Sequence, residues 1–122
     1  MKTALARRAL PQLLDIDGCV GACVVDQRTS ALLGSASRAD LDLPTCAAHA
    51  TSALRAQRAA IAGLGLASRV EDILVSSRHR YHLARPLGGQ PDVVLCLILD
   101  KAGTNIAVAR HELAAIERSL AR

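Results

Sequence analysis

The clearest hydrophobic pattern in the chain lies in residues 44–62, which read PTCAAHATSALRAQRAAIA. The segment is rich in alanine and has no β-branched run, and both features favour a helix. Pro44 suits the first turn of that helix, and Gly63 follows as a stop signal. On a helical wheel, one face carries the bulkier side chains that a helix needs to cover a sheet. That face consists of Cys46, Ala47, Ala50, Leu54, Gln57 and Ile61.

The other side of this predicted helix carries mostly small side chains. It contains Ala48, Ser52, Ala56, Ala59 and Ala60, whereas Arg55 sits beside the bulkier face. A solvent-facing arc is normally rich in Lys and Glu, whereas a bare arc lets a second helix approach closely. Alanine is also the strongest helix former, so an ordinary surface helix explains the pattern equally well. We expect one face to pack on the chain's own sheet, and the bare arc is a candidate partner surface.

The rest of the chain divides into further helices and strands. Apolar residues recur at helical spacing in residues 3–15 and 106–120, and Thr104 is a suitable N-cap for the second of these helices. Strand-like patterns occupy residues 19–25, 30–37, 70–76, 81–87 and 93–99. The order α-β-β-α-β-β-β-α predicts an α+β sandwich, in which the terminal helices cover one face of a five-stranded antiparallel sheet and the central helix covers the other. We expect residues 1–122 to form a single domain.

Composition narrows the classes of function. Apolar residues make up 51% and charged residues 21% of the chain, which excludes a disordered protein. No apolar run approaches the roughly 20 residues of a membrane span, and the N-terminus lacks the apolar core of a signal peptide, so we expect a cytoplasmic protein. One Tyr and no Phe or Trp leave almost nothing for stacking bases, and the net charge of +4 forms no basic stripe. No nucleic-acid partner is therefore expected.

The four cysteines, at positions 19, 23, 46 and 96, form no CxxC pair. Zinc sites normally show tight paired spacing, which is missing here. Cys19 and Cys23 stand four apart in one predicted strand, which would place them on one face about 13 Å apart and too far for a disulfide. We expect buried reduced thiols that act as small hydrophobic side chains, in preference to metal ligands or redox groups.

Catalytic signatures are missing from the sequence. There is neither a GxxxxGK[ST] loop for a nucleoside triphosphate nor a GxSxG nucleophile. Cys46 and His49 lie three apart on the central helix, but no acid is placed to orient the histidine. The histidines form no HxxxH or HExxH pair. We expect a protein that is not an enzyme and that needs neither a metal nor a cofactor.

The one local basic cluster is RHRYH, residues 78–82, at a predicted hairpin tip. Its candidate partner-binding residues are Arg78, Arg80 and Tyr81, which can meet an acidic protein surface or a phosphate. An ordinary solvent-exposed turn can have the same composition, so a partner-binding cluster and a plain surface turn both stay open.

Three stretches together resemble the roadblock family, which is also known from dynein light chains. LLDIDGCVGACVVD resembles the family's opening helix, turn and strand, YHLARPLGGQPDVVLCLILD resembles its final hairpin, and NIAVARHEL resembles the start of its last helix. The order and spacing of the three stretches carry the match, which covers nearly the whole chain. Two features depart from the family: the DQRTS turn lacks the glycine of many members, and the central helix is unusually rich in alanine.

The resemblance implies a non-enzymatic platform. Family members dimerise through the central helix and the adjoining edge strand, so that one sheet runs across both subunits. Bacterial and archaeal members commonly work with a small Ras-like GTPase, as a scaffold or as an activator of its hydrolysis. In this chain the edge strand would be residues 70–76. Together with the bare helix arc, this predicts a homodimer interface of Ala48, Ser52, Arg55, Ala56, Ala59, Ile73 and Val75.

A small-molecule sensor with the related profilin-like layout is the alternative function. Such sites converge polar groups inside an apolar cleft. The predicted inward positions of this chain are Val, Leu, Ile, Cys and Ala, with no interior polar residue. The pattern therefore favours the adaptor over the sensor.

Overall fold

The predicted strands pair into one antiparallel sheet in the computed structural model of the chain, which describes residues 2–121. The strands are β1 (Cys19–Asp26), β2 (Ala31–Ser37), β3 (Ile73–Ser76), β4 (Arg80–Pro86) and β5 (Val93–Asp100). The helices are α1 (Lys2–Leu14), α2 (Leu43–Gly63) and α3 (Ile106–Leu120), with a short 3-10 helix η1 (Lys101–Gly103) before α3. The strands lie in the order β2-β1-β5-β4-β3. The predicted order of elements and the fold class are confirmed.

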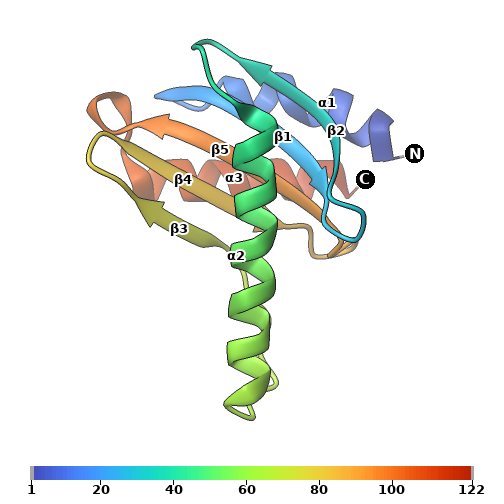
Figure 1. Cartoon of the computed structure of the whole chain (residues 1–122). Coiled ribbons are helices and arrows are strands. Elements are labelled where there is room, and N and C mark those ends of the chain that lie inside the picture. The colour runs from blue at the N-terminus through green and yellow to red at the C-terminus, as the bar shows by residue number, and fades with distance from the viewer. Residues whose placement is uncertain (1, 122) are drawn as a thin grey trace.

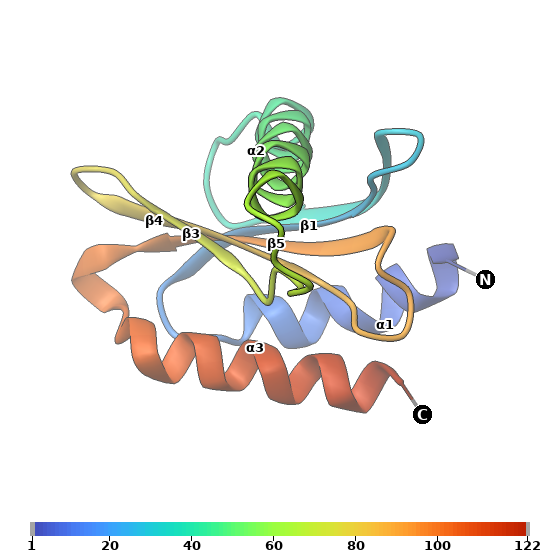
Figure 2. The same ribbon diagram turned by 90° about the horizontal axis from the view of Figure 1, so that it is seen from below.

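Helices cover the two faces of the sheet unequally. α1 and α3 lie on one face, and α2 crosses the other face alone, as predicted (Figure 1, Figure 2). The strand β5 lies in the middle of the sheet and is buried from Val93 to Leu99, because both of its faces are covered. The larger core packs beneath α1 and α3 around Leu13 and Leu113. The smaller core packs beneath α2 around Val25 and Leu54.

α2 covers the sheet with its first half only. Asp42 Oδ1 accepts a hydrogen bond from the N–H of Thr45 at 3.1 Å, and Pro44 occupies the first turn, as predicted. Beyond Leu54 the helix runs past the sheet (Figure 1), so Gln57, predicted to face the sheet, is exposed. The buried residues of α2 are Leu43, Ala47, Thr51 and Leu54. Within residues 2–121, neither this helix nor any other combines the length and apolar content that a membrane crossing requires.

The edge strand β3 is shorter than the pattern predicts. The pattern predicts a strand over residues 70–76, whereas the ladder with β4 begins at the pair Ile73 and Ala84. β4 ends at Pro86, and a proline has no N–H to donate to a further rung. Asp72 turns toward α3 instead, where Arg110 donates two hydrogen bonds to its carboxylate at 2.9 and 3.0 Å.

An irregularity in β1 separates two cysteines that a uniform strand would place on one face. The register between β1 and β5 shifts between Cys19 and Gly21, and such a shift turns the following side chains to the opposite face. Cys19 therefore lies in the core beneath α1 and α3, whereas Cys23 lies in the core beneath α2. The expectation that both share a face is wrong. Cys19, Cys23 and Cys96 are buried, as predicted, and Cys46 is half-buried.

Asn105, and not Thr104, caps α3. The side-chain oxygen of Asn105 accepts hydrogen bonds from the N–H groups of Ala107 at 3.1 Å and Val108 at 3.2 Å. The hydroxyl of Thr104 instead donates to the carbonyl of Asp100 at 2.7 Å and closes the turn after β5. Both residue types suit an N-cap, so the sequence alone could not decide between neighbours.

The Asn105→Ala variant should unfold with a free energy about 1 kcal/mol lower than that of the wild type, because two helical N–H groups lose their acceptor. Urea unfolding followed by circular dichroism measures this loss. Asn105→Asp keeps an acceptor and should stay close to the wild type. An equal loss in both variants would contradict the assigned cap.

Candidate functional site

One edge of the sheet is short, apolar and uncovered. β3 pairs with β4 along one side, and no strand among residues 2–121 pairs with its other side. Ile73 and Val75 face α2, and Leu74 points to the opposite face of the strand. Val75 is 50% exposed and Leu74 is 38% exposed. The free N–H and C=O groups of such an edge form a template for another strand.

An open groove of about 670 Å³ separates β3 from α2. Ala56 of the helix and Ile73 and Val75 of the strand meet across this groove, and all three belong to the predicted dimer interface. The residues of the helix that line it, here called the groove flank, are Ala53, Ala56, Gln57 and Ile61.

The other predicted interface residues on α2 lie on a different flank. Arg55 donates a hydrogen bond to the carbonyl of Gln27 after β1, so its side chain points away from β3. Ala48, Ser52 and Ala59 stand at helical spacings of three and four residues from one another and from Arg55, and they share its flank. All of them are exposed. This set, Ala48, Ser52, Arg55 and Ala59, is here called the outer ridge, and the fold does not bring it to β3.

The predicted partner-binding residues at the hairpin tip are also divided. Arg78 is exposed in the turn between β3 and β4. Arg80 Nε donates to a carboxylate oxygen of Asp100 at 3.1 Å. The Tyr81 ring lies 5.2 Å from the ammonium group of Lys101, within the range of a cation–π contact. Because successive side chains of a strand point to opposite faces, Arg80 and Tyr81 do not form one surface.

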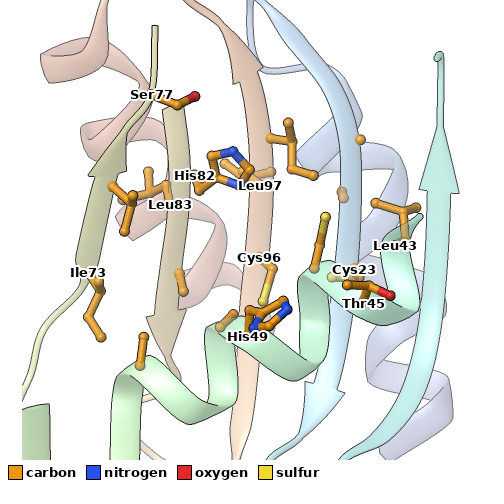
Figure 3. Close-up of a pocket in the computed structure, with 18 residues that line it drawn as sticks. Cys23, Leu43, Thr45, His49, Ile73, Ser77, His82, Leu83, Cys96 and Leu97 are labelled. Atoms are coloured by element: carbon orange, nitrogen blue, oxygen red, sulfur yellow. The ribbon is translucent and has the colours of Figure 1, made fainter. Parts of the chain in front are cut away.

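A cavity of about 270 Å³ lies between α2 and the part of the sheet beside it (Figure 3). Its mostly apolar lining includes the side chains of Cys23, Cys46, Cys96, His49 and His82. Sequence reasoning considered only Cys46 with His49 and missed the rest of this set, because its members come from four elements that no local spacing connects. The cavity is slightly smaller than the roughly 300–1,000 Å³ of typical small-molecule sites, so it does not favour the sensor alternative.

One histidine of this cavity, His82, is held in its uncharged form. Burial lowers the pKa of His82, and the neighbouring positive charge of Arg80 lowers it further, which keeps the imidazole neutral at pH 7. Within residues 2–121, no group of three or more His, Cys, Asp or Glu side chains is arranged to hold a metal ion.

Comparison with solved structures identifies the fold. A roadblock/LC7 domain from Streptomyces avermitilis superposes with a TM-score of 0.78 at 15% sequence identity, covering 92% of this chain and 91% of that chain. This chain has the roadblock fold. The gliding protein MglB from Thermus thermophilus gives a TM-score of 0.79 at 20% identity, covering 98% of this chain and 90% of that chain.

An MglB structure with a tetrameric arrangement is equally similar, with a TM-score of 0.80 at 21% identity over 98% of this chain and 89% of that chain. The sequence matches no model of a known protein family, and a search of curated proteins finds no match either. The resemblance found in the sequence is confirmed at the level of the roadblock fold.

Charged side chains tie the start of β3 to α3 in this roadblock fold. Asp72 accepts from Arg110 and lies 3.8 Å from the guanidinium of Arg85. Arg85 Nε also donates to Glu117 at 2.6 Å, and the N–H of Gly88 donates to the second Glu117 oxygen at 2.6 Å. The Asp72 side chain is 9% exposed, so this network is shielded from water more than an ordinary surface pair. It holds the uncovered edge in a defined position.

Acidification should weaken this network through Glu117. Burial raises the pKa of Glu117, but the hydrogen bonds from Arg85 and Gly88 and the positive charges of Arg85 and Arg69 together outweigh it and leave the pKa below its ordinary value. A carboxyl with a lowered pKa stabilises the folded state above its unfolded-state pKa, and this stabilisation is lost as the pH falls through the folded-state value. Glu117→Gln should therefore unfold more easily than the wild type at pH 7, with a difference that shrinks below about pH 4.

Urea titrations at several pH values measure this difference in the free energy of unfolding. The control variant is Asp40→Asn, at an exposed aspartate outside this network, and its free energy of unfolding should stay close to that of the wild type. A deficit of Glu117→Gln that stays constant with pH would contradict the assignment.

Proposed function

We propose that the chain, as a single roadblock domain, is a non-enzymatic adaptor that forms a homodimer and binds a small Ras-like GTPase. The dimer would form through β3 and the groove flank of α2. The observation that carries this proposal is the uncovered edge of β3 beside the open groove. The GTPase rests on the resemblance of the sequence to roadblock proteins.

Pairing of two β3 strands satisfies the unpaired backbone of both edges. In a twofold contact the same four residues, Ile73–Ser76, meet their own copy, and two five-stranded sheets become one. This removes an exposed edge that would otherwise favour aggregation. It also withdraws Leu74 and Val75 from water.

The groove between β3 and α2 supports a helix contact in addition to the strand pair. Alanines on the groove flank let a second helix approach closely. Two leucines in the loop after α2 extend the apolar surface past the end of the groove: Leu64 is 74% exposed and Leu66 is 56% exposed. Apolar side chains exposed together in this way mark protein contact sites. The tetrameric arrangement of an MglB with the same fold supports self-association of this chain as well.

The outer ridge of α2 is the proposed contact for the GTPase. It remains open when the groove is filled, and it carries alanine and serine where a solvated helix would carry Lys and Glu. A twofold axis through paired β3 strands would place both ridges on the same face of the joined sheet. The chain has no GxxxxGK[ST] loop, so a response to a nucleotide would have to come from the partner.

The Val75→Asp variant should be monomeric, because pairing of β3 would bury an unpaired carboxylate. Size-exclusion chromatography with light scattering at micromolar concentration measures the mass, which should be twice the chain mass for the wild type. Val108→Asp is a matched control, since Val108 on α3 is 49% exposed against 50% for Val75. It should remain dimeric.

The two flanks of α2 give a second comparison within the same measurement. Ala56→Glu places its charge in the groove and should split the dimer, whereas Ala59→Glu on the outer ridge should leave it intact. A monomeric wild type, or a dimer in both Val75→Asp and Ala56→Glu, would refute the proposed interface.

The GTPase partner should be captured in a nucleotide-dependent manner. The immobilised chain is incubated with lysate of the native cell plus either GDP or a non-hydrolysable GTP analogue. Mass spectrometry should then find a protein with a GxxxxGK[ST] loop enriched with one nucleotide over the other. Ala59→Glu should lose this protein while it stays dimeric, and Arg78→Glu tests the hairpin tip in the same way. Equal recovery with both nucleotides, or no such protein, would contradict the adaptor function.

A further inference from the structure

Two cysteines lie directly opposite each other beneath α2. Cys23 of β1 and Cys96 of β5 are partners in the antiparallel register. Opposite residues of antiparallel strands have Cα atoms about 4.5 to 5.5 Å apart, which falls within the roughly 4.4–6.8 Å that a disulfide spans. Both side chains belong to the core beneath α2. The register therefore places their Cα atoms at a separation that a disulfide can span, with both side chains on the same face of the sheet.

The cavity described above connects both buried thiols with exposed residues at its rim. Cys23 and Cys96 are part of its lining, and its rim includes the exposed residues His49, Val75 and Ser77. Figure 3 shows Cys23 and Cys96 in this cavity, with His49 on the helix that covers it. A volume of about 270 Å³ admits a small oxidant and excludes a protein thiol.

The two sulfurs have unequal chemical roles. A hydrogen bond from the Cys96 thiol lowers the pKa of Cys23 and outweighs the opposing effect of burial. The same contact raises the pKa of Cys96, and burial raises it further. The thiolate is the form that attacks an oxidant, and of the two thiols Cys23 is the one that ionises more readily. Cys96 lies directly opposite in the register and is placed to attack in the second step.

The other two cysteines lack this combination. Cys19 lies on the opposite face of the sheet, in the core beneath α1 and α3. Cys46 is on α2 above the pair, and burial raises the pKa of its thiol, with the nearby Cys23 adding to the effect. Position and chemistry thus select one pair among the four.

We propose that Cys23 and Cys96 form a dithiol oxidation site, at which a small hydroperoxide converts the pair to a disulfide. The Cys23 sulfur attacks the peroxide, an S–O bond forms as the O–O bond breaks, and the leaving oxygen takes up the proton of the Cys23 thiol and departs as water or an alcohol. The Cys96 sulfur then attacks the Cys23 sulfur, an S–S bond forms, and the sulfenic oxygen leaves as water with the Cys96 proton. The two thiols lose two electrons to the peroxide, and no further reactant is needed.

The site lies beside the proposed dimer interface but does not depend on it. Val75 is a rim residue of the cavity, so a second copy seated on β3 would narrow the entry. The Val75→Asp variant removes that obstacle and provides a form of the chain in which the cavity stays open. The oxidation chemistry and the dimer can therefore succeed or fail separately.

The test treats the reduced full chain, as wild type and as Val75→Asp, with hydrogen peroxide and follows the intact mass. Both proteins should lose the mass of two hydrogen atoms, and the monomeric variant should react at least as fast. Peptide mapping of the wild type should then join the Cys23 peptide to the Cys96 peptide. This mapping needs no cysteine substitution, so it is independent of how the cysteine variants fold.

Single cysteine variants complete the test. Cys23→Ser and Cys96→Ser should lose the disulfide, whereas Cys19→Ser and Cys46→Ser should keep it. No mass loss in either parent protein, a disulfide that includes Cys46 or Cys19, or a bond between two chains would overturn the proposal. A wild type that is monomeric but still forms the Cys23–Cys96 disulfide would refute the proposed interface and leave this site standing.

Discussion

Five strands at a spacing of about 4.8 Å span about 19 Å, whereas one helix with its side chains is about 10 Å wide. Two helices therefore cover one face of this sheet, and a single helix cannot cover the other. α2 lies against β1, β2 and β5, which leaves a strip over β3 and β4 beside it. The groove and the exposed Val75 lie in this strip, and the thiol-lined cavity extends from it beneath α2. The surfaces proposed for self-association and for oxidation therefore follow from the difference in width between the sheet and the single helix α2.

The two edge strands of the sheet, β2 and β3, differ in how well they are covered. β2 lies under α1, so closely that a Cβ at Gly34 would come within 2.9 Å of Leu10, and its register with β1 is interrupted between Val24 and Val25. Irregular and covered edges resist pairing with another chain. β3 has a regular register with β4, and no strand within residues 2–121 pairs with its outer side. Of the two edges, β3 is thus the one suited to a second copy.

The unequal helix cover of the two sheet faces also gives the cysteines different surroundings. A thiol sealed beneath two helices, such as Cys19, acts as a small hydrophobic side chain. The pair Cys23 and Cys96 has the same residue type but lies under the narrow helix, next to a cavity that opens beside it. The chemical difference between these thiols comes from the layer above them and not from the residues themselves.

Local patterns in the sequence were sufficient for the elements and their order. Periodicity of 2 and 3.6 residues is a property of neighbouring positions, so the helices, the strands and the buried run of β5 could be predicted, and the roadblock resemblance agreed with them. Weaker local signals misled the prediction in two places. Thr104 and Asn105 both suit the N-cap of α3, so the pattern could not choose between them. The strand-like pattern of the edge strand begins at residue 70, but pairing with β4 begins only at Ile73.

Features that depend on several distant segments could be decided only by the tertiary structure. The bare arc of α2 reads as one surface in the sequence, but the crossing of the helix over the sheet assigns Ala56 to the groove and Ala59 to the outer ridge. The register shift in β1 places Cys23 opposite Cys96 and removes Cys19 to the other face. The sequence by itself determined which residues are helical, extended and apolar, because these are local properties. The pairing of the strands, the crossing of α2 over the sheet and the helix cover of each face were decided by packing, because they depend on which distant surfaces meet.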